Sequence, residues 1–129
     1  MKSTLRLGLL VALLAAFAYA FSSGALRGDE EPREVFLVAR NMAFALQGAP
    51  ERTPNPTIEL RPGERVRFVL INLDPGMRHD LVMDRLEMRT PGLAHGEMAA
   101  IEFTAPARGE SDYYCSFHSV LMRGRIVVR

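Results

Sequence analysis

The residues best suited to chemistry lie close together near the C-terminus. Cys115 is the only cysteine of the chain, and His118 and Met122 follow it within a few positions. A thiolate and a thioether are soft ligands that suit Cu(I), whereas an imidazole suits copper in both of its oxidation states. We therefore expect these three side chains, carried by one short loop between two strands, to bind a single metal ion.

A trigonal copper site needs a second imidazole, and His79 is the best candidate for it. His79 follows the turn-forming residues Asp74-Pro75-Gly76 and begins a segment that is expected to be a strand. Loops gather at the two ends of a β-sandwich, so His79 is able to meet the Cys115 loop there. The remaining histidine, His95, lies in a glycine-containing stretch typical of an exposed loop. The predicted metal ligands are His79, Cys115, His118 and Met122.

Short strands separated by turns must position these ligands. Apolar and polar residues alternate, or apolar residues run together, over 35–38, 43–46, 57–60, 65–72, 79–83, 97–103, 112–115 and 125–128. Turn residues separate these runs, which is typical of a sandwich or barrel. Residues 85–94 fit either one short helix or an irregular loop. On this basis, we predict an all-β sandwich whose core includes Val66, Phe68 and Leu70, with Ile101, Phe103, Ile126 and Val128 facing them.

The ligand spacing also fits one face of a helix, which would make the same residues part of a core. Tyrosines before Cys115 and β-branched residues after Gly124 favour strands instead. Met77, His79 and Met83 share strand parity, so a Met/His cluster for Cu(I) is a further alternative.

The N-terminal segment has the features of an export signal. Residues 5–21 are almost uninterruptedly apolar, Lys2 and Arg6 stand at their front, and Ala18-Tyr19-Ala20 follows. We interpret residues 1–21 as a signal peptide or an N-terminal membrane anchor, 22–33 as a linker and 34–129 as one folded domain. Without Lys2 and Arg6, 14 basic residues face 15 acidic ones, so a nucleic-acid partner is not expected.

The C-terminal segment resembles the cupredoxin family (plastocyanin- and azurin-like type 1 copper proteins). Tyr113-Tyr114-Cys115, His118, Met122 and Gly124 match the family's closing loop, and Asn72 with His79-Asp80 matches its upstream ligand context. The resemblance spans residues 34–129. It implies a Greek-key β-sandwich of about 7–8 strands, one copper ion, and electron entry and exit through His118. Asp80 stands where several cupredoxins have an asparagine that stabilises the ligand loop.

These features predict a copper electron-transfer protein that is exported to the periplasm or the outer face of the cytoplasmic membrane. Its partners would be redox proteins, and residues 5–26 would associate with the membrane if they are retained. Four ligands leave no open position on the metal, so no enzymatic activity and no small-molecule substrate are expected. The alternative is an exported copper-delivery protein with the same ligands. A zinc site and a subunit of a larger copper oxidase are less consistent with Met122 and with the single cysteine.

Three arginines, Arg78, Arg123 and Arg125, flank the ligands in the sequence. We interpret them either as a solvated rim or as a positive patch that orients an acidic redox partner.

Overall fold

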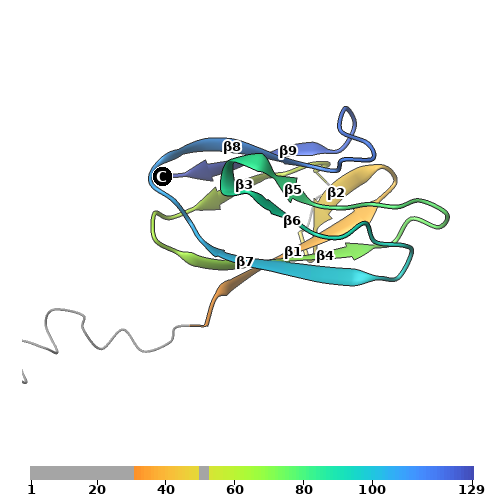
Figure 1. Cartoon of the computed structure of the whole chain (residues 1–129), viewed down its shortest axis with the longest axis horizontal. Coiled ribbons are helices and arrows are strands. Elements are labelled where there is room, and N and C mark those ends of the chain that lie inside the picture. The colour runs from red at the N-terminus through yellow and green to blue at the C-terminus, as the bar shows by residue number, and fades with distance from the viewer. Residues whose placement is uncertain (1–30, 50–52) are drawn as a thin grey trace, which may run out of the picture. The chain divides into compact units, whose positions relative to one another are not determined.

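The computed structural model describes residues 31–49 and 53–129, which form a two-layered β structure (Figure 1). The proposed signal or anchor segment 1–21 and residues 22–30 of the proposed linker lie outside the described residues. Arg33, the last residue of that linker, is the first residue of β1. The strands are β1 (Arg33–Arg40), β2 (Ala43–Leu46), β3 (Thr57–Leu60), β4 (Arg65–Asn72), β5 (Val82–Met83), β6 (Met88–Arg89), β7 (Met98–Thr104), β8 (Gly109–Tyr114) and β9 (Arg123–Val128). A 3-10 turn, η1 (Asp84–Leu86), lies between β5 and β6.

The strands form two mixed sheets. One has the order β2-β1-β4-β7, with β1 parallel to β4, and the other has the order β3-β9-β8-β5-β6, with β3 parallel to β9. The described residues contain no α-helix. The all-β sandwich expected from the sequence is therefore confirmed.

The segment around His79 differs from the expected strand. Only Val82–Met83 is a strand there, and His79 forms an isolated antiparallel bridge with Leu93. The physical reason is that Leu81 is only half paired through the backbone: its carbonyl accepts from the amide of Thr90, but its own amide donates to the hydroxyl of Thr90 instead of to a carbonyl. Residues 85–94 contain the end of η1 and the two-residue β6 rather than an α-helix. β6 is the one strand that was not expected, so the described residues contain nine strands where eight were predicted.

The core lies between the sheets, as expected for alternating strands. Val66, Phe68 and Leu70 are fully buried. Ile101 and Phe103 are neighbours within the same sheet rather than residues facing from the other layer, and the ring of Phe103 stacks on Phe68 with centroids 5.6 Å apart. Ile126, on β9, belongs to the other sheet and completes the core from that side.

The strand ends next to the predicted ligands meet at one end of the sandwich. β4 ends at Asn72, β8 ends at Tyr114 and β9 begins at Arg123, so the loops after β4 and between β8 and β9 project from the same end (Figure 1). We call this the ligand end. No helix in the described part of the chain is long and apolar enough to cross a membrane, and the proposed anchor lies outside that part.

Candidate metal centre

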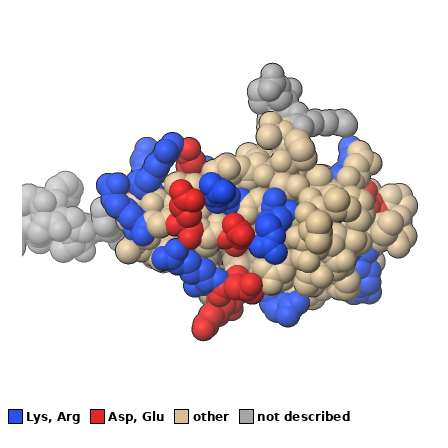
Figure 2. All heavy atoms as spheres, turned by 90° about the horizontal axis from the view of Figure 1, so that it is seen from above, with Lys and Arg blue, Asp and Glu red and all other residues tan. Residues whose placement is uncertain are grey.

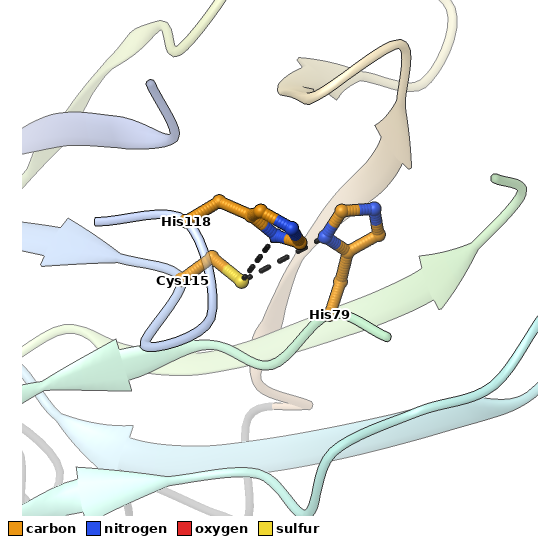
Figure 3. A group of neighbouring side chains, drawn as sticks. All are labelled: His79, Cys115 and His118. Carbon is orange, nitrogen blue, oxygen red and sulfur yellow. Dashed lines mark hydrogen bonds between the residues drawn. The ribbon is translucent and has the colours of Figure 1, made fainter. Parts of the chain in front are cut away.

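Three of the four predicted ligands converge at the ligand end. His79, Cys115 and His118 offer ligand atoms that all lie within 4.8 Å of one another. The sulfur of Cys115 is 3.7 Å from Nδ1 of His79 and 3.8 Å from Nδ1 of His118. Figure 3 shows the three side chains pointing toward one another. Two imidazole nitrogens and one sulfur thus surround a common point.

The loop after β8 owes its shape to its own backbone. The amides of His118 and Leu121 donate to the carbonyls of Cys115 and His118, at 3.2 and 3.1 Å, so two tight turns follow one another. The amide of Met122 also donates to His118, at 2.9 Å. These turns direct His118 back toward Cys115, as the short spacing in the sequence requires.

Met122 closes this loop. Its carbonyl accepts a hydrogen bond from the amide of Cys115 at 3.0 Å, which brings the two ends of the loop together. The side chain of Met122 is fully buried and belongs to the same apolar cluster as Cys115. Met122 thus ties the end of the ligand loop to the core.

The alternative Met/His cluster has less support. Met77 is 44% exposed, whereas His79 and Met83 are buried. The exposed loop position expected for His95 is confirmed.

Asp80 holds the two ligand-bearing loops together. Its carboxylate accepts hydrogen bonds from the amide and the hydroxyl of Ser116, both at 2.6 Å, and lies 3.3 Å from the guanidinium of Arg89. The side chain is almost completely buried. Asp80 therefore makes the loop-stabilising contact that the resemblance assigns to this position, with a carboxylate in place of an amide.

Burial dominates the electrostatics of Cys115. Removal of the thiol from water raises its pKa, and hydrogen bonds from neighbouring backbone amides oppose the shift only in part. In the metal-free chain this favours the protonated thiol. A metal ion that binds the thiolate would consequently release a proton.

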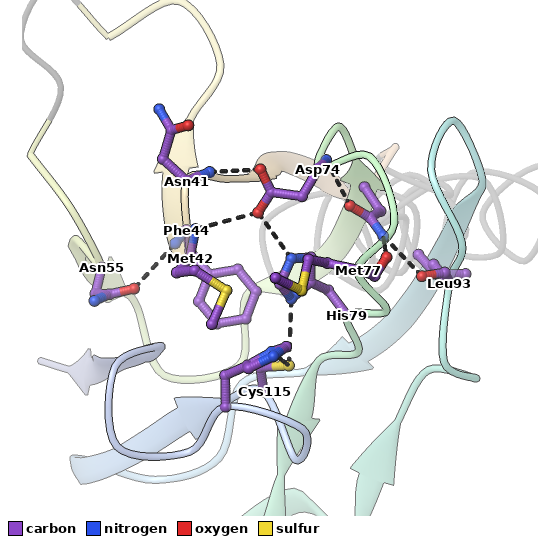
Figure 4. A network of polar contacts seen from close by, with 11 residues as sticks. Asn41, Met42, Phe44, Asn55, Asp74, Met77, His79, Leu93 and Cys115 are labelled. Carbon is purple, nitrogen blue, oxygen red and sulfur yellow. Dashed lines mark hydrogen bonds and ion pairs between the residues drawn. The ribbon is translucent and has the colours of Figure 1, made fainter.

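The position of His79 is fixed by a network of buried polar groups (Figure 4). His79 exchanges two backbone hydrogen bonds with Leu93, at 3.1 and 2.7 Å. The side-chain amide of Asn72 donates to the backbone carbonyls of Met77 and Leu93, both at 2.8 Å. It thereby joins the two segments that precede His79 and pair with it. On the far side of the ring, Nε2 of His79 is 2.9 Å from a carboxylate oxygen of Asp74.

Two residues of this network were missed by the sequence reasoning. From the sequence, Asp74 is expected only as a turn residue, and no role is expected for Asn55. Asn55 joins the loop before β3 to the ligand loop, because its side-chain amide donates to the carbonyl of Leu121 at 2.8 Å while its oxygen accepts from Phe44. The signal in the sequence was that Asp74 precedes the candidate ligand His79 by five positions. In an irregular segment, however, this spacing does not predict whether the two side chains meet.

Of the four predicted ligands, His118 is the one that reaches solvent. His79, Cys115 and Met122 are fully buried, whereas His118 is partly exposed. Its loop also exposes three large apolar side chains, Phe117, Val120 and Leu121. Figure 2 shows arginine and acidic side chains interleaved over one part of the molecule and a mostly uncharged surface toward the ligand end.

The flanking arginines are largely paired. Arg123 lies 2.9 Å from Asp112 and stacks on the ring of Tyr114, and Arg125 lies 3.4 Å from Glu110. Arg78 donates to the carbonyl of Gly92. These contacts fit a solvated rim better than a positive patch.

The donor set suits one type 1 copper ion. Two Nδ1 atoms and one cysteine sulfur surround a common point, and the buried Met122 ends the same loop. Two histidines and one cysteine with a weak thioether are the ligands of blue-copper sites, and thioether is a poor ligand for zinc. The chemistry of the residues present thus fits the group that the sequence predicted.

Comparisons with known proteins agree with this geometry. The family model of cupredoxin-like domains matches residues 9–128. The chain is similar to auracyanin A, a "blue" copper protein of Chloroflexus aurantiacus, at 18% identity and a TM-score of 0.60, over 77% of this chain and 100% of that one. It is also similar to reduced rusticyanin, at 22% identity and a TM-score of 0.56, over 78% and 82% of the two chains. No curated protein sequence matches.

An enzyme is among the similar structures. The copper-containing nitrite reductase of Thermus scotoductus shares 29% identity at a TM-score of 0.52, over 78% of this chain but only 23% of the reductase. The same fold therefore occurs both in small copper proteins and as a part of larger enzymes.

Proposed function

This chain belongs to the family of cupredoxin-like domains, and we propose that it is a mononuclear type 1 copper protein that transfers single electrons. The observation that carries the proposal is the convergence of His79, Cys115 and His118 within 4.8 Å. Met122 is proposed as the fourth, axial ligand, on the strength of its burial beside Cys115. A copper ion held there would supply one-electron chemistry by alternating between Cu(II) and Cu(I).

The surrounding residues suit electron transfer more than bond-making chemistry. Hydrogen bonds to the carboxylate of Asp80, from the side chain of Asn55 and within the loop backbone hold the ligand loop in one conformation. Because the ligands are already held in place, they would move little when a bound copper ion gains or loses one electron. Four protein ligands would leave no position for a substrate, and we therefore propose no enzymatic activity and no small-molecule substrate.

His118 is the proposed route for electrons, because it alone of the four ligands reaches solvent. The exposed apolar side chains around it, Phe117, Val120 and Leu121, offer a surface on which a redox partner protein could dock. We propose that the domain works outside the cytoplasm, in the periplasm or on the outer face of the cytoplasmic membrane. The support for this location is the apolar N-terminal segment with Lys2 and Arg6 before it.

A visible absorption spectrum of the Cu(II)-loaded protein tests the proposal, with Cys115→Ser as the matched variant. We expect an intense thiolate-to-copper band that reductant bleaches reversibly, and complete loss of the band in the serine variant. Serine keeps the size of the side chain but removes the thiolate. Bound copper without such a band would contradict the proposal.

The alternative, an exported copper-delivery protein with the same ligands, differs in how readily it gives up the metal. The measurement is the rate at which a competing Cu(I) chelator removes copper from the reduced protein. Slow loss favours electron transfer, because three buried ligands and a hydrogen-bonded loop resist release. Loss within the mixing time would favour delivery.

A further inference from the structure

Asp74 is a buried carboxylate outside the predicted ligand set. It is 7% exposed and lies in the turn after β4. One oxygen accepts a hydrogen bond from the amide of Asn41 at 2.6 Å, and the other accepts from the amide of Met42 at 3.1 Å and contacts Nε2 of His79 at 2.9 Å (Figure 4). Both oxygens are therefore engaged by groups that donate.

The turn between β1 and β2 is shaped to receive this carboxylate. Asn41 and Met42 both have left-handed backbone conformations, with φ of 54° and 58°. Non-glycine residues rarely adopt this region, and here it aims two successive amides at the same carboxylate. Successive amides in such a turn form a concavity that binds anions. This stabilises the ionised form of Asp74.

The contacts offset the cost of burying a charged group. Two backbone amides and Nε2 of His79 face the two oxygens of Asp74. Asp80, the other buried carboxylate near the centre, has an arginine for a partner, whereas the ion-pair partner of Asp74 is His79 itself.

The contact with Asp74 determines which ring nitrogen of His79 carries the proton. An ionised carboxylate only accepts, so Nε2 of His79 must donate to it. The lone pair of Nδ1 is then free, and Nδ1 is the atom that faces the sulfur of Cys115 at 3.7 Å. Carboxylates that bind the outer nitrogen of a ligating histidine fix its orientation and increase its basicity.

We propose that Asp74 is a positioning residue that fixes His79 with Nδ1 toward Cys115 and, through its buried negative charge, lowers the reduction potential of the centre. The inference rests on the proposed function. A negative charge beside the imidazole favours the oxidised site, which carries one more positive charge than the reduced site. The charge is buried, so salt and water screen it weakly.

The test is a redox titration of Asp74→Asn, followed by the thiolate-to-copper band. Only folded, copper-loaded molecules absorb, so the potential is read correctly even if the variant is less stable. We expect a higher potential than in the wild type. The matched control is Asp112→Asn, which makes the same change at a half-exposed side chain paired with Arg123. We expect a smaller shift in this control, because solvent screens the exposed charge.

A second measurement does not depend on copper loading. Nitrogen-15 NMR of the metal-free wild-type protein reports which ring nitrogen of each histidine is protonated. We expect His79 to carry a slowly exchanging proton on Nε2, while exposed His95 exchanges rapidly. If Asp74→Asn binds no copper, the position of the His79 ring proton in the metal-free wild type tests the inference instead.

Two results would overturn the inference. One is a potential for Asp74→Asn that does not rise above that of Asp112→Asn, and the other is a proton on Nδ1 of His79. Neither result touches the proposed function, which fails if the wild type shows no thiolate-to-copper band or loses its copper to the chelator within the mixing time.

Discussion

The two ends of the sandwich are held together by different kinds of contact. At the ligand end, five polar or charged residues are buried: Asn72, Asp74, His79, Asp80 and Thr90. At the opposite end, where β1 and β4 begin and β9 ends, the charged groups form ion pairs at the surface. Arg33 pairs with Glu64, Arg65 with Glu102 and Arg129 with Glu59, and most of these side chains are about half exposed or more.

The difference shows what an exact metal geometry requires of a small β-sandwich. In the described part of the chain, every buried side-chain nitrogen or oxygen has a hydrogen-bond partner. Removing one member of such a network leaves its partner buried and unsatisfied, which costs about 1–3 kcal/mol. An exposed ion pair contributes about 0–1 kcal/mol. We therefore expect changes at the ligand end to cost more stability than matched changes at the opposite end.

The largest effect is expected for Gly124→Ala at the start of β9. A Cβ at this position would overlap the ring of Tyr113. That ring cannot move easily, because its hydroxyl donates to the carbonyl of Pro56 at 2.6 Å and its face packs against Phe44 with centroids 5.4 Å apart. We expect the free energy of unfolding, measured with urea, to fall by about 3 kcal/mol, at the upper end for overpacked cores. Unchanged stability would mean that the ring is free to move.

A smaller loss is expected for Asp80→Ala, which makes the sharpest comparison between the two ends. The change leaves the amide and hydroxyl of Ser116 without their acceptor and Arg89 without its partner. We expect a loss of about 2 kcal/mol in the metal-free protein. The matched change at the opposite end is Glu102→Ala, which should cost less than about 0.5 kcal/mol. Equal losses in the two variants would refute the proposed difference between the ends.

The smallest effect is expected for the stability of the protein in acid, and it concerns Glu64. This carboxylate lies at the opposite end of the sandwich, yet its side chain is only 19% exposed, so the contrast between the two ends is not complete. Burial tends to raise the pKa of Glu64, but hydrogen bonds from the Arg61 amide and the Arg33 guanidinium place it below its ordinary value of 4.5. A lowered pKa means that this group stabilises the fold above about pH 4.5 and that the contribution is lost as the pH falls below that value.

The variant Glu64→Gln tests this. We expect the unfolding free energies of the variant and the wild type to differ at pH 7 and to converge toward pH 3, measured on the metal-free protein. A constant difference between the two pH values would show that the charge of Glu64 does not contribute.

Much of the ligand loop could be predicted from the sequence. Three of the proposed ligands lie within eight residues of one another, between a tyrosine-rich strand and a β-branched strand. Chain connectivity alone keeps such residues close. The alternation in β4 likewise predicted Val66, Phe68 and Leu70 as core, because side chains of a strand point to opposite faces in turn.

The short strands β5 and β6 could not be predicted in the same way. The segment 79–83 has the composition of a strand, but its pairing depends on which groups lie nearby in space. Thr90 and Leu93 supply those partners, and neither is marked by any periodic pattern.

The tertiary structure alone decided how the centre is completed. His79 lies 36 positions from Cys115, and the sequence could only suggest that two loops at one end of a sandwich would meet. Asp74 contacts His79 over 5 positions, but it is itself held by the amide of Asn41, 33 positions away, and Asn55 binds the ligand loop at Leu121, 66 positions away. Local spacing is set by covalent connection, whereas contacts over such separations depend on sheet register and on how each loop packs. For this reason, the sequence determined which residues could bind the metal, and the fold determined which residues hold them in place.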